Sequence, residues 1–325
     1  MADKNKIVDV PEHHDDLVNF IKNSYSLKPE SLYMDELNWK YLIRSAVRGK
    51  NIMMTGPSGC GKTLAAKTVQ SVLKDFGRPG FYFNMGATQD PRSTLIGNTH
   101  FKEGTGTLFS ESLFVKAIRT QNAVILLDEL TRAHPDAWNI LMTVLDYKQR
   151  YLRLDEKDNC ETVKVAHGVT FVATANIGSE YTATRVLDRA LQDRFTIIEI
   201  PVLVAEEEVK LLQYIYPDVN KDLLLKVAEF AHDSRMEINT ETPHISTMIS
   251  TRMSVELAGL LYDGFGFIES AEVAVFPFFP TDGGNDSERS FIKKMAQRFD
   301  TTDENGEEED MVDLFTDDDM KDAFN

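Results

Sequence analysis

The sequence predicts an α/β fold, with a mostly parallel five-stranded sheet covered by helices on both faces. Short apolar runs bounded by Gly, Asp and Asn recur between residues 51 and 203, and stretches with helical spacing separate them. Continuous apolar runs of this length are typical of parallel strands that are buried on both faces. We therefore expect strands within residues 51–56, 80–86, 122–129, 168–176 and 196–203.

The same patterns divide the chain into four expected parts. Residues 1–30 are polar with one short amphipathic piece, and residues 31–203 carry the alternating strands and helices. Residues 204–275 have helical spacing interrupted by turn signals, which predicts a small α-helical domain. Residues 276–325 form a C-terminal extension, in which 289–299 predict one more helix before an acidic tail.

Charge and composition limit the classes of function. The net charge is −17, and residues 300–325 supply −11 of it through twelve acidic residues and one lysine. The rest of the chain is mildly acidic, so the generally basic surface of a nucleic-acid-binding protein is absent. No apolar run approaches the length of a membrane span, and the first residues lack the apolar segment of a secretion signal. Two cysteines, Cys60 and Cys160, are too few for a disulfide framework, so we expect a cytoplasmic location.

The acidic tail is expected to be disordered and solubilising. Its acids are mixed with Met311, Leu314, Phe315, Met320 and Phe324. The alternatives are a docking peptide for a basic groove, or an internal decoy that guards against nucleic acid.

The first motif is GPSGCGKT, residues 56–63, which follows a predicted strand and opens a predicted helix. In such a loop the glycines let backbone N–H groups close around phosphate oxygens, and the helix N-terminus adds a partial positive charge. Lys62 is expected to reach the β- and γ-phosphates of ATP, and Thr63 to ligate Mg²⁺. The expected nucleotide-binding residues are Gly56, Pro57, Ser58, Gly59, Cys60, Gly61, Lys62, Thr63 and Leu64. The helix is expected to turn five side chains toward the sheet, those of Leu64, Ala65, Val69, Val72 and Leu73.

The second motif is AVILLDEL, in which two carboxylates follow a buried strand. Asp128 is expected at the carboxyl end of that strand, where open α/β sheets bind their ligands, and it would hold the Mg²⁺ through water. Glu129 is the candidate base, because hydrolysis needs a carboxylate that orients the attacking water without being committed to the metal.

These two motifs, followed by ATAN ending at Asn176 and by LDRALQDRF at 187–195, resemble AAA+ ATPases in order and approximate spacing. The resemblance covers about residues 35–265. Within that class the chain is similar to the MoxR branch, which includes the CobS-like chelatase ATPases. The phrases that carry this similarity are GTLFSESLFVKAI, DELTRAHPDAWNILMTVLD and FVATANIG, with Thr131 where the MoxR phrase has Asn.

The resemblance implies roles for further residues. Asn176 would help to position the attacking water, and Arg252 in the helical domain would reach back to the γ-phosphate. Asn84 would either hold Glu129 inactive or serve as a plain turn residue. In this family the nucleotide lies between subunits, and an arginine of the neighbouring subunit completes its binding site. The resemblance therefore implies a ring, which we expect to be a hexamer. Arg194 is expected to be that arginine, and Arg189 would join it or pair with a nearby aspartate.

Two insertions indicate the working surface. Residues 97–111 contain a Gly-Thr-Gly turn between Phe101 and Phe109 and predict a hairpin. Residues 147–168 predict a second hairpin, which starts with the basic cluster KQRYLR at 148–153. Such hairpins in related rings face the pore or the client, although Phe101 packed inside an ordinary surface hairpin is the alternative.

By resemblance, the favoured function is ATP-driven remodelling of a client protein, for which a partner with a von Willebrand A-type domain is implied. Three alternatives remain open. The first is the motor subunit of a chelatase that inserts cobalt or magnesium into a tetrapyrrole. The second is a nucleic-acid motor of the McrB kind, to which the basic cluster would contribute. The third is a scaffold that binds ATP and barely hydrolyses it.

Overall fold

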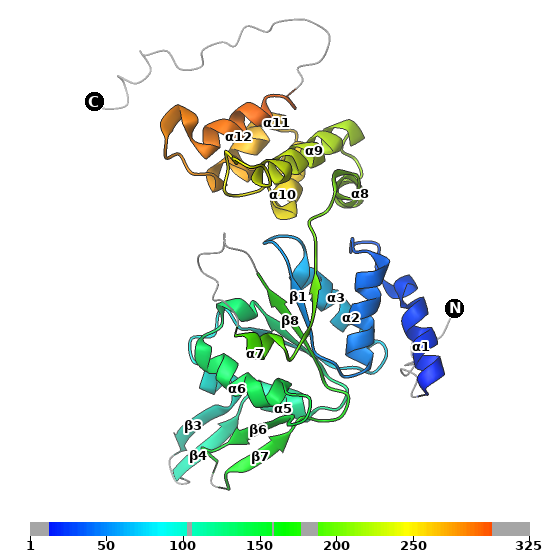
Figure 1. Cartoon of the computed structure of the whole chain (residues 1–325), viewed down its shortest axis with the longest axis vertical. Coiled ribbons are helices and arrows are strands. Elements are labelled where there is room, and N and C mark those ends of the chain that lie inside the picture. The colour runs from blue at the N-terminus through cyan, green and yellow to red at the C-terminus, as the bar shows by residue number, and fades with distance from the viewer. Residues whose placement is uncertain (1–12, 103–105, 158, 177–187, 301–325) are drawn as a thin grey trace, which may run out of the picture.

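The computed structural model describes residues 13–102, 106–157, 159–176 and 188–300, and the acidic tail lies outside this range. Five parallel strands form the central sheet in the order β2-β5-β8-β1-β9 (Figure 1). Their bounds are Ile52–Thr55 for β1, Gly80–Asn84 for β2, Val124–Asp128 for β5, Thr170–Ala175 for β8 and Thr196–Glu199 for β9. Each predicted apolar run supplies one strand, so the predicted α/β fold and its five strands are confirmed.

Helices cover both faces of the sheet because side chains alternate along each strand. In β5, Ile125 and Leu127 belong to one apolar cluster with the helices α5 and α6, whereas Val124 and Leu126 belong to another with α1, α2 and α3. The helices of this part of the chain are α1 (His14–Asn23), α2 (Glu36–Val47), α3 (Lys62–Lys74), α4 (Pro91–Leu95), α5 (Leu113–Arg119), α6 (Pro135–Leu145) and α7 (Arg189–Gln192), with 3₁₀ turns at Ser24–Leu27 and Leu130–Arg132.

One predicted orientation on α3 is wrong. Ala65, Val69 and Leu73 are buried and Val72 is half-buried, as expected, but Leu64 is 54% exposed. Leu64 lies on the helix face of Lys67 and Thr68, three and four residues further on, and this polar face points away from the sheet.

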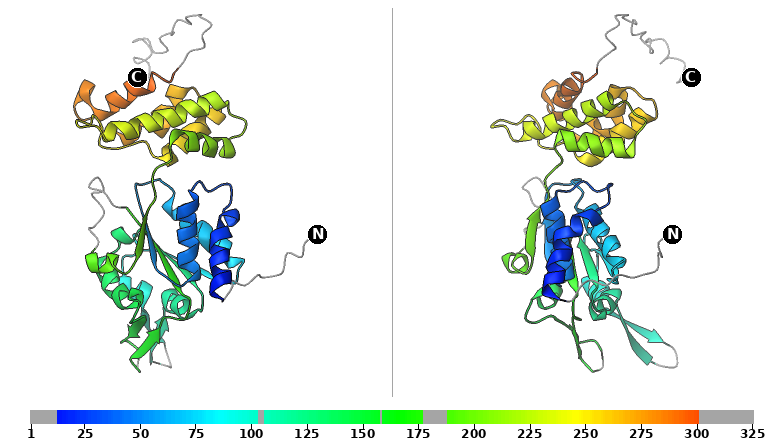
Figure 2. Two further views of the ribbon diagram at one scale, coloured as in Figure 1. Left: turned by 45° about the vertical axis from the view of Figure 1, so that its right-hand side comes forward. Right: turned by 90° about the vertical axis from the view of Figure 1, so that its right-hand side faces the viewer.

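Both predicted hairpins are confirmed. Strands β3 (Gly97–Lys102) and β4 (Gly106–Glu111) pair antiparallel, as do β6 (Tyr151–Leu154) and β7 (Glu161–Lys164). The β3–β4 hairpin projects from the end of the sheet domain that is remote from the C-terminal helices (Figure 2). Phe109 packs against the core, whereas Phe101 is 80% exposed, so the alternative that Phe101 packs inside is wrong.

A separate helical region follows the sheet and has its own apolar cluster. Its helices are α8 (Ala205–Ile215), α9 (Lys221–Ile238), α10 (Thr251–Tyr262), α11 (Phe267–Ala274) and α12 (Glu288–Ala296), with 3₁₀ turns at Phe276–Phe278 and Gly284–Asp286. Helix α12 corresponds to the helix predicted within 289–299, and Ile292 and Met295 of this helix are buried in the same cluster as α9 to α11. No helix among the described residues is long and apolar enough to cross a bilayer.

A buried ion pair anchors the helical region to the segment that leaves β9. Arg235 is 5% exposed and donates to Glu208, which is fully buried, with 3.0 Å between Nη2 and Oε1. The same guanidinium donates to the carbonyl oxygens of Leu203 at 2.8 Å and Ile249 at 3.0 Å. Arg235 therefore joins α9, the segment before α8 and the segment before α10.

Replacing Arg235 with methionine is expected to destabilise the protein by about 3–5 kcal/mol, because Glu208 is left buried without its counter-ion. Replacing both residues with methionine should recover most of that loss, since no buried charge remains. Urea denaturation followed by circular dichroism measures both changes. A double variant no more stable than Arg235→Met alone would show that the carbonyl contacts, rather than the pair, stabilise this junction.

Candidate functional site

The predicted phosphate loop lies between β1 and α3, as the motif requires. Gly59 and Gly61 have φ angles of +80° and +93°, and Gly61 is the N-cap of α3. Lys62 folds back over the loop, where its Nζ donates to the carbonyl oxygens of Gly56 at 2.9 Å and Pro57 at 2.5 Å. Burial lowers the pKa of Lys62, and the nearby Cys60 thiol opposes that shift. The ammonium is thus held above the loop with neutral oxygen partners that a phosphate can replace.

Asp128 is buried and accepts hydrogen bonds from three hydroxyl groups at the carboxyl edge of the sheet. Its Oδ1 accepts from Thr63 Oγ1 at 2.8 Å and from Thr174 Oγ1 at 2.5 Å, and its Oδ2 accepts from Tyr82 at 3.0 Å. Burial, together with this hydrogen bond and the negative charges of Asp128 and Glu129, raises the pKa of Tyr82 to about 12. The structure therefore brings Thr63 and Asp128 together, as the sequence predicts.

Glu129 stands beside this network in a left-handed backbone conformation, with φ at 55°. Its N–H donates to Thr174 Oγ1 at 2.9 Å, while its carboxylate is partly exposed and lies 3.5 Å from the Arg132 guanidinium. Such a conformation is uncommon outside glycine, and it turns the Glu129 side chain away from the line of the strand. The side-chain oxygen of Asn84 accepts a hydrogen bond from the N–H of Ala87 at 3.2 Å. This contact agrees with the alternative that Asn84 is a plain turn residue.

Asn176 directly follows β8, the strand between β5 and β1. Its N–H donates to the hydroxyl of Thr131 at 3.3 Å, and Thr131 is buried. Thr131, the departure from the MoxR phrase, thus joins the segment after β5 to the segment after β8. The four polar residues Thr63, Asp128, Glu129 and Asn176 all lie at one edge of the sheet.

The helical region reaches the phosphate loop through the start of α10. Ser250, the N-cap of α10, lies so close to Gly59 that a Cβ built on Gly59 would be 2.7 Å from Ser250 Cβ. Arg252 is exposed in the first turn of α10 and lines a cavity of about 820 Å³ together with Pro57 and Ser58 of the loop. Arg252 is therefore placed beside the loop, where the resemblance expects it.

Two glycines of the loop offer a matched test of this contact. Gly61→Ala should cost about 1–2 kcal/mol, because its left-handed backbone disfavours a side chain while the space around it is empty. Gly59→Ala carries the same backbone cost and should lose a further 1–3 kcal/mol, roughly, because its Cβ would overlap Ser250. Urea denaturation without nucleotide compares the two. Equal losses would mean that α10 does not rest on the loop.

The candidate Arg194 lies at the opposite edge of the sheet from the loop of its own chain. Ile52 pairs with Thr196 in parallel register, so Arg194, two residues before β9 begins, is next to the amino end of β1. The Arg194 guanidinium donates to Met142 O at 2.9 Å and to Ala190 O, and it lies 3.4 Å from Asp146. Arg189, in the first turn of α7, is exposed.

The basic cluster at 148–153 is not a uniform surface patch. Arg150 turns inward and donates to Val169 O at 2.6 Å and Asn51 Oδ1 at 3.2 Å. Arg153 pairs with Asp155 at 2.8 Å. Arg150 is therefore not part of an exposed basic surface, and Arg153 lies beside a carboxylate.

Sequence reasoning missed Thr174, Tyr82 and Ser250. Thr174 lies between two alanines in the ATAN phrase and Tyr82 between two phenylalanines in FYFN, so each interrupts an apolar strand near its carboxyl end. A hydroxyl at that place in a parallel sheet is a usable signal for a group that faces the ligand edge. Ser250 carried only the signal of a helix N-cap.

Residues 51–195 match the family described as AAA domain (dynein-related subfamily). BssE, named a putative chaperone of Thauera aromatica, is 34% identical over 165 residues, which are 50% of this chain and 54% of that protein. An uncharacterized protein of Staphylococcus haemolyticus is 29% identical over 220 residues, 67% of this chain and 73% of that protein. A mitochondrial Lon protease homolog of Dictyostelium discoideum is 31% identical over 195 residues, 58% of this chain and 19% of that protein.

The chain spans about half the length of BssE. The matched residues begin just before β1 and end just before β9, so they contain the phosphate loop, Asp128, Glu129 and Asn176. The strand order and the loop between β1 and α3 agree with this match. Residues 51–195 of this chain therefore combine an α/β P-loop fold with a match to the AAA domain family.

Proposed function

We propose that this chain is an Mg²⁺-dependent ATPase that works in a ring of the MoxR type and remodels a client protein. The observation that carries the proposal is the cluster at the carboxyl edge of the sheet. There Thr63 and Asp128 are 2.8 Å apart, and the Glu129 carboxylate stands next to them without being part of the hydroxyl network. This separates a metal-holding pair from a candidate base.

The residues present fit both ATP and Mg²⁺. Gly61 has open space around its Cα, so the backbone N–H groups at the start of α3 can approach phosphate oxygens closely. Lys62 would exchange its contacts with Gly56 O and Pro57 O for the phosphates. Thr63 and Asp128 supply the oxygen ligands that Mg²⁺ prefers. The bound ion would neutralise charge on the phosphate oxygens.

Hydrolysis would then use groups of two subunits. Glu129 would orient and deprotonate water, Asn176 would help to position it, and Arg252 would contact the γ-phosphate from the helical region. Arg194 lies too far along the sheet to serve its own loop, so it would serve the neighbour's, and Arg189 would join it there. A head-to-tail contact of this kind closes into a ring, for which we propose a hexamer.

A protein client fits the projecting β3–β4 hairpin. Phe101 and Leu108 of this hairpin are both largely exposed. Exposed apolar side chains on a projecting element suit contact with unfolded or partly unfolded protein better than contact with a polyanion. The name of BssE, a putative chaperone, points the same way. A client or partner with a von Willebrand A-type domain is the narrower form of this proposal.

The test is the ATPase rate per chain as a function of protein concentration. We expect the rate to rise with concentration and reach a plateau as rings assemble, with sedimentation velocity following the same transition. Lys62→Met should abolish hydrolysis at all concentrations. This result would show that the measured ATPase rate comes from the phosphate-loop site. A rate per chain that is constant down to concentrations at which sedimentation shows only monomers would rule out shared sites.

A further inference from the structure

A second cavity lies at the amino edge of the sheet, opposite the phosphate loop. It is lined by residues that precede four of the five parallel strands: Gly49 before β1, Arg78 before β2, Asn122 before β5 and Gly168 before β8. Its volume is about 1190 Å³, somewhat above the range of roughly 300–1,000 Å³ that is usual for small-molecule sites. Because all these strands run in one direction, the length of a strand separates this cavity from Lys62 and Asp128.

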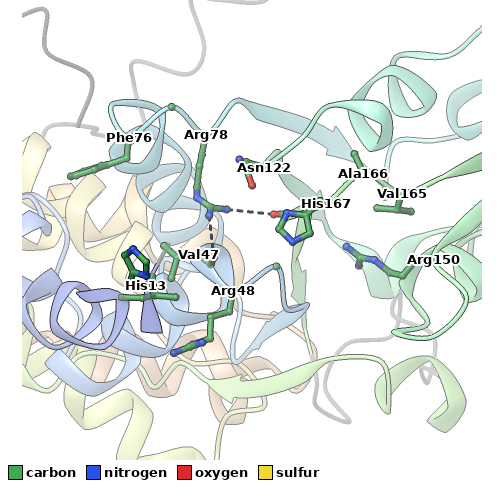
Figure 3. A pocket seen from close by; sticks show the side chains of 14 residues that line it. His13, Val47, Arg48, Phe76, Arg78, Asn122, Arg150, Val165, Ala166 and His167 are labelled. Atoms are coloured by element: carbon green, nitrogen blue, oxygen red, sulfur yellow. Dashed lines mark hydrogen bonds between the residues drawn. The ribbon is translucent and has the colours of Figure 1, made fainter. Parts of the chain in front are cut away.

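The cavity is lined by positive side chains. Arg48, Arg78 and Arg150 come from three separate segments and line the same cavity (Figure 3). His13 and His167 also line it, and among the described residues that do so there is no aspartate or glutamate. Leu17, Val47 and Phe76 form an apolar part of the wall.

Arg78 is held in place by neutral partners. It is 7% exposed and donates to the carbonyl oxygens of Ala46 at 2.9 Å and Val47 at 3.0 Å, at the C-terminal end of α2. Its Nε is buried and has no hydrogen-bond partner among the described residues. The partial negative charge of a helix C-terminus offsets part of this buried cation, but it supplies no full counter-charge.

Arg150 is also held by neutral groups alone, namely Asn51 Oδ1, Val169 O and the ring of Phe171 at 5.4 Å. Burial lowers the pKa of both Arg78 and Arg150, and no carboxylate contributes to either pKa. Keeping one buried and one half-buried guanidinium group without a counter-ion is costly, and an anion in the cavity would offset that cost.

We propose that this cavity binds a small anion with two or more phosphate groups, at a site separate from the ATPase site. Guanidinium groups match phosphate oxygens in geometry, and each phosphate group carries a charge of about −1.5 to −2. Two phosphate groups therefore balance the three arginines. Inorganic pyrophosphate and the diphosphate of a nucleotide share this chemistry, and the apolar wall at Phe76 offers a surface for a base.

Equilibrium dialysis with ³²P-labelled pyrophosphate in EDTA tests the proposal on the full chain. Lys62→Met removes the phosphate loop as a competing site, and this variant should still bind one pyrophosphate per chain. Adding Arg48→Met should weaken that binding by about tenfold or more, since it removes one charged contact. Arg48 is suited to this test because, among the described residues, its side chain contacts only His14, at 3.4 Å, so the fold does not depend on it.

Arg44→Met is the matched control, because Arg44 is exposed on the same helix and does not line the cavity. In the Lys62→Met background it should leave the affinity within about twofold. Labelled ADP, measured with the same variants, distinguishes a nucleotide from an inorganic phosphate compound as the ligand. Tighter binding of ADP would identify a nucleotide, and tighter binding of pyrophosphate would identify an inorganic compound. The proposal is overturned if Lys62→Met binds neither ligand, or if Arg48→Met and Arg44→Met bind them equally well.

Discussion

Replacing Glu129 with glutamine should lower the ATPase rate by about 10²–10⁴-fold, the contribution usual for a general base. ATP binding should persist, because the phosphate loop, Thr63 and Asp128 are untouched. The substitution changes one oxygen of a side chain that is partly exposed and contacts only Arg132 among charged groups, so the fold should be unaffected. Steady-state hydrolysis and the binding of a fluorescent ATP analogue together separate the two effects.

Asp136→Asn is the control for this experiment. Asp136 is a carboxylate of the same strand-to-helix segment, its side chain is 64% exposed, and it lies in the first turn of α6. Its neutralisation should leave the rate within about twofold, because its carboxylate lies beside His134 and takes no part in the hydroxyl network around Asp128. Equal losses in the two variants would indicate a general effect of charge, and Glu129 would lose its assignment as the base.

The fold could be predicted because its signals are local. Each parallel strand is a mainly apolar run, and GPSGCGKT joins a strand to a helix in a way that few other sequences do. Leu64 shows where such reasoning fails, because an apolar residue next to Ala65 was assigned to the wrong helix face. The polar residues at its helical neighbours, Lys67 and Thr68, already indicated exposure.

The contacts of the site depend on register between strands, which the sequence alone does not fix. Tyr82 and Thr174 reach Asp128 only because Asn84 pairs with Asp128 and Leu127 with Ala173. The second cavity is a stronger case, since residues from four loops far apart in the sequence meet there. In the sequence its arginines have no feature that separates them from ordinary charged surface residues. The pattern around Arg150 instead predicts an exposed basic cluster.

Arg194→Ala should nearly abolish ATP hydrolysis, by about 10³–10⁵-fold if its guanidinium stabilises the γ-phosphoryl group in trans. The same change should also destabilise the chain by about 1.5–3 kcal/mol, because Arg194 donates to Met142 O within its own subunit. Arg189→Ala should have no such effect on stability, since Arg189 is exposed at the start of α7. Comparing rate and stability for both variants distinguishes a catalytic loss from a structural one.

An equal mixture of Glu129→Gln and Arg194→Ala chains provides the decisive form of this test. Each homogeneous variant should be inactive. In a mixed ring, however, an intact Glu129 meets an intact Arg194 wherever an Arg194→Ala subunit receives the arginine of a Glu129→Gln neighbour. Random assembly places that arrangement at about a quarter of the interfaces, so the mixture should recover about a quarter of the wild-type rate if sites act independently. Recovery cannot occur if each chain uses its own Arg194, which the parallel pairing of Ile52 with Thr196 places at the far edge of the sheet. A mixture as inactive as its components would therefore transfer the trans role to Arg189, for which the same mixing experiment applies.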